Sequence, residues 1–233
     1  MRLSKYLSKS GVASRREAEK LIQSALITIN GNVEMSPYYN VKKNDIVKYD
    51  SMVVKDNQES IVIMLNKPAG FITSMKDPMN RKIVSDLINL KERVFPIGRL
   101  DKDTTGLLLF TNQGDLAQKL SHPRFNIPKI YKSAIDRPFV SWEKKKISKK
   151  VYIGQKEWGK AEVLGQKKMN GKVIVKLKLE QGKKREIRRI MYRMKRSLYF
   201  LKRIEFGPCK LGKLKEGQWR FLQKDEILEL NNL

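Results

Sequence analysis

The chain has 233 residues, 40% of them hydrophobic, which is enough for one large domain or for a small and a medium one, each with an apolar core. Its 50 lysines and arginines outnumber 24 aspartates and glutamates, and the net charge of +26 favours a polyanionic partner, nucleic acid above all. A single cysteine, Cys209, excludes an internal disulfide and a cysteine-cluster metal site, and a single histidine, His122, argues against a histidine-based zinc site or a Ser-His-Asp triad.

No apolar stretch approaches the roughly 20 residues that a membrane-spanning helix needs. The segment that starts at Met1 is amphipathic at once and lacks the apolar core of a secretory signal. We therefore expect a cytoplasmic protein without a membrane partner. A monomer is also expected.

The first 50 residues have the pattern of a small α+β unit. Apolar residues at helical spacing in 3–7 predict a short helix, and Ser14 followed by Glu17 is a capping-box signature that opens a second one. Alternating apolar residues on both sides of Asn30-Gly31 predict a hairpin, and 45–47 supplies a closing strand. Two helices followed by a small sheet are expected.

Residues 51–60 are polar, lack a clear period, and are predicted to form a linker. Beyond them, strands are predicted at 61–65, 107–110, 130–135, 173–179, 201–206 and 228–230, and helices at 82–90, 115–120, 141–150 and 185–194. Because strands outnumber helices and come at irregular spacing, we expect an α+β fold with a mixed, mostly antiparallel sheet and peripheral helices. Trp142, Trp158 and Trp219 are expected in the core or at subdomain contacts rather than as base-stacking platforms.

Residues 98–114 read GRLDKDTTGLLLFTNQG and carry the most informative carboxylate of the chain. Asp101 stands two residues after Arg99 and precedes a turn of small residues and a fully apolar run. Taken alone, it could equally cap the turn before Thr104. The chain has no phosphate-binding glycine loop and no metal-ligand spacing, so neither a cofactor nor a metal is expected. A carboxylate, a tyrosine and arginines can still perform nucleophilic or proton-transfer chemistry.

Five segments occur in the order of a known family: LNKPAG at 65–70, the 98–114 run, KIY at 129–131, EQGKKREIRRI at 180–190 and LKRIEFGP at 201–208. Together with the first 50 residues, they resemble the RsuA/RluB-type ribosomal RNA pseudouridine synthases with an N-terminal S4 RNA-binding domain. The resemblance implies an S4-like αα-β domain at 1–50, a linker at 51–60 and a catalytic domain at 61–233.

The resemblance also implies roles for individual residues. Asp101 would be the catalytic aspartate, as a nucleophile or as a base on the sugar, and Arg188 its cationic partner. Tyr131 would pack against the uracil ring, and its hydroxyl could assist proton transfer. Arg99 would hold the flipped nucleotide or its phosphate, and Leu179 and Ile187 would wall the pocket. The RNA-facing residues of the S4-like unit would be Arg2, Lys5, Ser14, Arg15, Arg16 and Lys20.

The expected activity is the cofactor-independent isomerisation of specific uridines in ribosomal RNA, either free or within a subunit assembly intermediate. Departures from the family pattern motivate an alternative, a non-catalytic RNA-binding or ribosome-assembly factor that retains the scaffold. Gln181 interrupts the family motif at 180–190, and Glu186 stands where that motif usually has glutamine. Residues 195–198 replace the Gly-His-Pro-Val run that usually follows. Residues 107–112 and 121–124 resemble the large-subunit branch of the family slightly more, so large-subunit RNA is the slightly favoured substrate.

Overall fold

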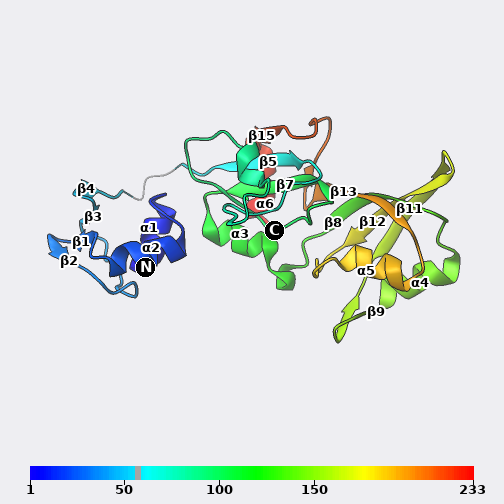
Figure 1. Cartoon of the computed structure of the whole chain (residues 1–233), viewed down its shortest axis with the longest axis horizontal. Coiled ribbons are helices and arrows are strands. Elements are labelled where there is room, and N and C mark those ends of the chain that lie inside the picture. The colour runs from blue at the N-terminus through cyan, green and yellow to red at the C-terminus, as the bar shows by residue number, and fades with distance from the viewer. Residues whose placement is uncertain (56–58) are drawn as a thin grey trace. The chain divides into compact units, whose positions relative to one another are not determined.

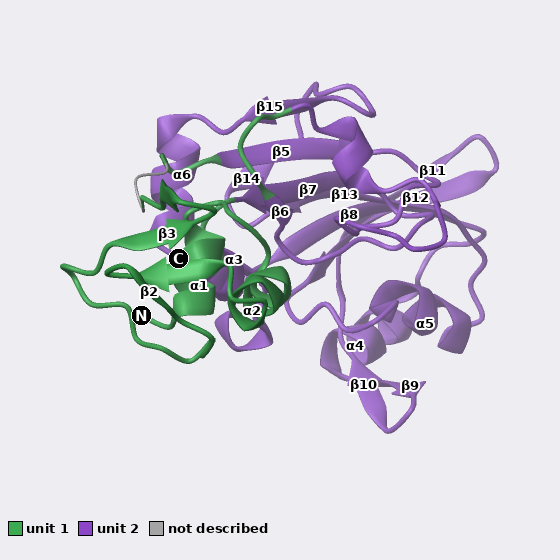
Figure 2. Cartoon of the chain, turned by 60° about the vertical axis from the view of Figure 1, so that its left-hand side comes forward, with its two compact units in different colours: residues 1–61, 90–94, 112–114 green, residues 62–89, 95–111, 115–233 purple. Residues whose placement is uncertain are grey.

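The computed structural model describes residues 1–55 and 59–233, which form two compact units (Figures 1 and 2). Unit 1 comprises residues 1–61, 90–94 and 112–114. Unit 2 comprises residues 62–89, 95–111 and 115–233. Each unit has its own hydrophobic core.

Unit 1 has the expected helix-helix-sheet order. Helices α1 (Leu3–Lys9) and α2 (Arg15–Gln23) precede an antiparallel sheet with strand order β2-β1-β3-β4, from β1 (Ile27–Ile29), β2 (Asn32–Val33), β3 (Val47–Tyr49) and β4 (Met52–Val53). The predicted capping box forms at the start of α2. The Ser14 hydroxyl accepts from the Glu17 amide at 3.3 Å, and the Glu17 carboxylate accepts from the Ser14 amide at 3.1 Å.

Part of the predicted linker at 51–60 is instead folded into unit 1. Met52–Val53 pairs with β3, and Val54 is 9% exposed in the core of the unit. Met52 and Val53 are exposed on this edge strand, and it is the backbone pairing with β3 and the buried side chain of Val54 that override the polar composition around them. Residues 56–58 of the predicted linker lie outside the described residues.

Unit 2 contains the large mixed sheet, which confirms the expected fold class. Its strand order is β11-β12-β8-β13-β7-β5-β15, with β14 paired to β13 and β6 paired to β7. The strands are β5 (Val62–Lys67), β6 (Phe95–Pro96), β7 (Thr105–Thr111), β8 (Lys129–Ile135), β11 (Glu162–Met169), β12 (Lys172–Leu179), β13 (Leu198–Phe206), β14 (Cys209–Lys210) and β15 (Trp219–Phe221). Neighbours are antiparallel except for the parallel pair β7 and β13 among the described strands.

The apolar run after Asp101 becomes β7 in the middle of this sheet. Both faces of the strand are covered, since Leu107, Leu108, Leu109 and Phe110 are all 0% exposed. A strand buried on both faces reads as a continuous apolar run rather than an alternating one. The run therefore anchors the preceding loop, and with it Asp101, to the buried interior of the sheet.

Helices and a small hairpin surround the sheet (Figure 1). They are α3 (Gly114–Ser121), α4 (Ser141–Lys149), α5 (Glu186–Arg193), α6 (Lys224–Asn231), the 3₁₀ turns η1 (Val84–Leu87) and η2 (Pro123–Phe125), and a separate antiparallel hairpin of β9 (Val151–Gly154) and β10 (Glu157–Gly159). The helix predicted at 82–90 is thus only the single turn η1.

The strand predicted at 228–230 was wrong, because these residues lie in α6. The Glu226 carboxylate accepts from the Gln223 amide at 2.9 Å and so caps the first turn. Ile227 and Leu230, three residues apart, pack on the core, whereas Leu228 is 61% exposed. The helical period, not the short apolar run, decides the structure here.

The expectation for the tryptophans was wrong at two positions. Trp142 on α4 is 62% exposed and Trp158 on β10 is 44% exposed. Trp219 on β15 is partly buried. Large aromatic side chains on the surface of a highly basic protein call for a reason other than packing.

Candidate active site

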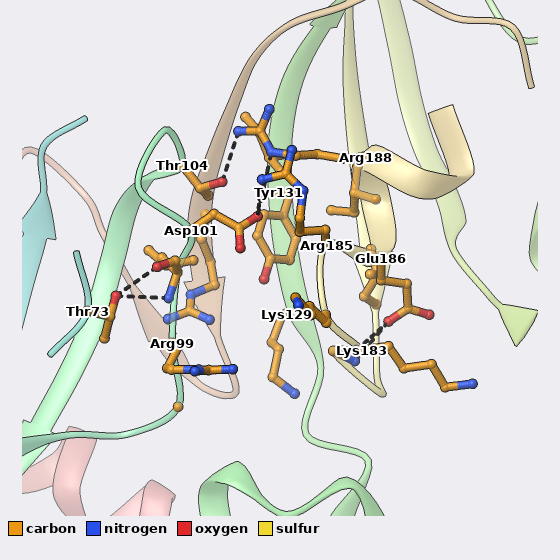
Figure 3. A pocket seen from close by; sticks show the side chains of 18 of the residues that line it. Thr73, Arg99, Asp101, Thr104, Lys129, Tyr131, Lys183, Arg185, Glu186 and Arg188 are labelled. Carbon is orange, nitrogen blue, oxygen red and sulfur yellow. Dashed lines mark hydrogen bonds and ion pairs between the residues drawn. The ribbon is translucent and has the colours of Figure 1, made fainter. Parts of the chain in front are cut away.

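A pocket of about 470 Å³ opens in unit 2 between the loop 98–104, strands β8, β12 and β13, the loop 181–185 and the start of α5 (Figure 3). Its size suits a single nucleotide, since ligand pockets run from roughly 300 to 1,000 Å³. Segments that lie far apart in the sequence therefore meet at one concave site.

The loop that carries Asp101 is held through its backbone. Thr73 accepts from the Leu100 amide at 3.2 Å and donates to the Leu100 carbonyl at 2.8 Å through the same hydroxyl. The Thr104 amide donates to the Asp101 carbonyl at 3.0 Å and closes the turn. These backbone contacts fix the turn while the side chain of Asp101 lines the pocket.

A buried lysine supports this loop from beneath. Lys67 is 0% exposed, and its Nζ donates to the carbonyl oxygens of Pro68, Lys102 and Thr104 at 3.0, 3.1 and 2.9 Å. Burial lowers the pKa of Lys67 to about 8, opposed by the nearby negative charges, Asp103 and Asp101 among them. Lys67 therefore links β5 to both sides of the turn and acts as a structural residue.

Two arginines face the Asp101 carboxylate. The Nε of Arg188 lies 3.6 Å and the Nη1 of Arg185 lies 3.9 Å from its Oδ2 atom. Arg188 also donates from Nη2 to the Thr104 hydroxyl at 3.1 Å, so that one guanidinium contacts both ends of the turn (Figure 3). The structure thus brings the predicted aspartate and its predicted cationic partner together, and adds Arg185, which the sequence did not single out.

Tyr131 and Lys129 project into the pocket from β8. Tyr131 is 8% exposed and lies beside Asp101 in Figure 3. Lys129 is also 8% exposed, and its Nζ donates to the carbonyls of Ile127 and Glu180 at 2.9 and 3.2 Å. Residues two apart on a strand share a face, so the position of Tyr131 was the signal that could have revealed Lys129.

The environment of Lys129 disfavours its charge. Burial is the main cause that lowers its pKa to about 8, and the neighbouring Arg203 adds to the effect, whereas Glu186 opposes it. Arg203 itself is 2% exposed and donates from Nε to the Leu107 carbonyl at 2.7 Å. Its Nη2 is buried without a hydrogen-bond partner among the described residues. The floor of the pocket is therefore crowded with cationic groups.

Glu186, the departure for which the sequence offered no reason, has a clear structural role. It is 3% exposed, and its Oε2 accepts from the Gly182 and Lys183 amides at 3.0 and 2.9 Å. Its Oε1 accepts from the Lys160 amide at 3.1 Å. A carboxylate, which only accepts, satisfies three backbone donors at once. Glu186 therefore fixes the 181–185 loop that brings Arg185 to Asp101.

The remaining predicted pocket residues, Arg99, Leu179 and Ile187, all line this pocket. Leu179 and Ile187 are 3% and 4% exposed, and their side chains form an apolar wall of the pocket. Arg99 comes from the loop just before Asp101, and Figure 3 shows its side chain apart from the Asp101 carboxylate.

The residues predicted to face RNA lie in unit 1. Arg15, Arg16 and Lys20 are exposed on α2, Arg2 is exposed just before α1, and Lys5 is partly buried on α1. Ser14 differs from them because its hydroxyl accepts from the Glu17 amide, so its side chain caps the helix. The Arg2 guanidinium lies 5.4 Å from the ring centre of Tyr38.

Within residues 1–55 and 59–233, no three His, Cys, Asp or Glu side chains gather where they could hold a metal ion. In the same part of the chain, no helix is both long and apolar enough to cross a membrane.

Two family models match the chain. The family model for RNA pseudouridylate synthase matches residues 61–192, and the model for the S4 domain matches residues 1–47. An RNA-modifying enzyme is thus the class that the fold and the matched region define. The chain belongs to the RNA pseudouridine synthase family.

Named relatives cover the whole chain. It is 34% identical to the ribosomal large subunit pseudouridine synthase B of Bacillus subtilis (strain 168), over 100% of this chain and 96% of that protein. It is 33% identical to the dual-specificity RNA pseudouridine synthase RluF of Escherichia coli (strain K12), over 100% of this chain and 79% of that protein. A crystal structure of a pseudouridylate synthase superposes with a TM-score of 0.69 at 23% identity, over 99% of both chains, and supports the fold.

Proposed function

We propose that this protein converts specific uridines of ribosomal RNA into pseudouridine without a cofactor, with Asp101 as the catalytic aspartate. The observation that carries the proposal is the position of the Asp101 carboxylate in a nucleotide-sized pocket, 3.6 Å from Arg188. The names of the two relatives support ribosomal RNA as the substrate class. We place the reaction in the cytoplasm, on free RNA or on a subunit assembly intermediate.

The proposed reaction is an isomerisation and is balanced without a co-reactant. The bond between N1 and C1′ breaks, the uracil turns, and C5 bonds to C1′ while its proton is lost and N1 gains one. Asp101 acts on the sugar, either as the nucleophile at C1′ or as a base. Arg188 holds the carboxylate in place and offsets its negative charge when RNA covers the pocket and excludes water.

The target base must leave its helix or loop stack to reach Asp101. In the pocket, the ring of Tyr131 packs against the uracil, and Leu179 and Ile187 close the sides. Arg99 at the opening contacts the phosphate of the flipped nucleotide. We propose that residues 1–50 act as an S4-like RNA-binding domain that delivers the substrate to a catalytic domain formed by 61–233.

The test is the pair of variants Asp101→Asn and Asp103→Asn. Both remove one carboxylate from the same turn, but Asp103 is exposed and does not line the pocket. With ribosomal RNA tritiated at uridine C5, D101N is expected to bind RNA and release no tritium, whereas D103N keeps its activity. Normal turnover by D101N would refute the proposed role.

Pseudouridine mapping in cells that lack the protein tests the substrate. A missing modification in ribosomal RNA is the expected result. An unchanged map together with a subunit-assembly defect would instead favour a non-catalytic assembly factor. Glu186 was one departure from the family pattern that motivated this alternative. Its contacts with three backbone amides give it a structural reason that is compatible with an active enzyme.

A further inference from the structure

The β9–β10 hairpin presents two aromatic rings on its outer face. Tyr152 and Trp158 are directly paired across the hairpin, and their ring centres lie 5.4 Å apart in an edge-to-face arrangement. They are 43% and 44% exposed, whereas Val151 and Ile153 on the opposite face are both 4% exposed. The apolar residues of the inner face account for the packing of the hairpin, so packing does not explain the outer pair.

Cations flank both rings. The Nζ of Lys150 lies 4.8 Å from the ring centre of Trp158, and the guanidinium carbon of Arg193 lies 5.5 Å from that of Tyr152. Aromatic faces interleaved with lysine and arginine are the arrangement that binds single-stranded nucleic acid, by stacking bases and by neutralising phosphates. The patch, defined as Lys150, Tyr152, Trp158 and Arg193, therefore complements a polyanion with exposed bases.

The hairpin is fixed to the helix that carries the candidate active-site arginine. Arg189, next to Arg188 on α5, donates to the carbonyls of Ile153 and Gly154 at 2.8 and 2.6 Å. It also forms an ion pair with Glu157, the single acidic residue between positions 150 and 160. In Figures 1 and 2 the hairpin lies beside α5. The negative charge of the hairpin is thus compensated, and its outer face is left basic.

The patch is also connected to the pocket. Lys183 lines the pocket, and its Nζ donates to the backbone carbonyl of Trp158. Glu186 at the start of α5 accepts from the amide of Lys160, directly after the hairpin. Two residues that line the pocket therefore contact the backbone of the hairpin that carries the patch or of the residue directly after it.

We propose that Tyr152 and Trp158 form a stacking site for an unpaired nucleotide of the RNA strand near the target uridine. The proposal rests on the proposed function for the identity of the RNA, and adds a second recognition site outside the pocket. The charge of the patch favours RNA over a protein partner or a second copy of this chain. Stacking requires a free base, so the site selects single-stranded RNA around the target.

The experiment compares a single-stranded oligouridylate with an abasic strand of equal length and charge. Trp158→Ala is expected to weaken binding of the oligouridylate about tenfold, within the range measured for loss of one stacked base. Binding of the abasic strand is expected to stay unchanged. Trp158→Phe, which keeps a ring, should restore most of the affinity, whereas Trp158→Leu should not.

Trp142→Ala is the matched control. Trp142 is also exposed and has a lysine over its ring, with Lys146 Nζ at 5.9 Å, but it lies on α4. The proposal would be overturned if W158A bound the oligouridylate as tightly as the wild type, or if W142A lost as much affinity for it as W158A. It would also be overturned if W158A lost equal affinity for the oligouridylate and the abasic strand. So would loss of self-association in W158A without loss of RNA affinity, which would assign the patch to a second copy.

Fluorescence separates this proposal from the proposed function. With Trp142 and Trp219 changed to Phe, Trp158 is the sole tryptophan of the chain, and its emission is expected to be quenched by the oligouridylate. Quenching in a protein that isomerises no uridine would refute the proposed function alone. Turnover of ribosomal RNA without quenching would refute the stacking site alone.

Discussion

The backbones of Gly106 and Arg203 touch where the parallel strands β7 and β13 meet. These two residues are direct partners in the pairing of the strands, and a Cβ atom on Gly106 would lie 2.1 Å from the Arg203 carbonyl oxygen. Gly106 also has a φ of +102°, a backbone conformation that residues with a Cβ atom rarely adopt. The glycine that follows the Asp101 turn therefore allows the close approach of β13, whose Arg203 forms part of the pocket.

Gly106→Ala is expected to lower the free energy of unfolding by about 3 kcal/mol or more, because the Cβ would force apart two backbones in addition to the strained φ. Urea unfolding measures the effect. Gly114→Ala is the control, since a Cβ there meets nothing within 4 Å. A G106A protein as stable as G114A would contradict the account of this contact.

Arg188→Lys is expected to reduce kcat at least about tenfold, because a lysine cannot contact Asp101 and Thr104 together as the guanidinium does. Single-turnover tritium release measures the chemical step. Arg185→Lys is the matched control, since the Arg185 side chain is 49% exposed and its Nη1 lies 3.9 Å from Asp101. Equal losses of kcat in the two variants would show that Arg188 has no special position.

Glu186→Gln is expected to destabilise the protein by about 1 kcal/mol, because the side-chain amide leaves at least one of three partly buried backbone N–H groups without its acceptor. Chemical denaturation gives the change. Glu162→Gln serves as the control, since the Glu162 side chain is 57% exposed and its ion pair with Lys178 spans 3.9 Å. If E186Q proved no less stable than E162Q, the three amides would not depend on the carboxylate.

Lys129→Met is expected to change how stability depends on pH. The pKa of Lys129 is about 8 in the folded protein and about 10.5 in the unfolded chain. Between these values the unfolded chain holds a proton that the folded protein has lost, so the contribution of Lys129 to stability rises as pH rises from about 8 to 10.5. Below pH 8 its buried charge opposes folding.

Urea titrations at several pH values between 7 and 10.5 compare the wild type with K129M. The difference in unfolding free energy isolates Lys129, because Lys67 and Cys209 titrate in both proteins. Relative to K129M, the wild type is expected to gain stability as pH rises through this window. A difference that is constant with pH would rule out a depressed pKa for Lys129.

Much of this protein could be predicted from local sequence. The Ser14–Glu17 capping box forms as expected, since its hydrogen bonds join residues three apart. The long apolar run at 107–110 predicted a buried strand because a fully covered strand needs no polar face. The order of motifs along the chain indicated the family, and with it Asp101, Tyr131 and Arg188.

Other features depend on contacts that no local pattern encodes. The sequence could not reveal that Lys67 lies beneath the Asp101 turn, that Glu186 accepts from three amides, or that α6 replaces a predicted strand. Lys67 contacts Lys102 and Thr104, and Glu186 contacts Lys160, across more than 25 positions of the chain, so these partners meet only in the folded protein. For α6, the short apolar run at 228–230 hid a helical period that becomes plain once Ile227 and Leu230 pack on the core. The exposed pair Tyr152 and Trp158 was likewise decided by tertiary structure, because the inner face of the hairpin packs on α5 and leaves both rings facing solvent.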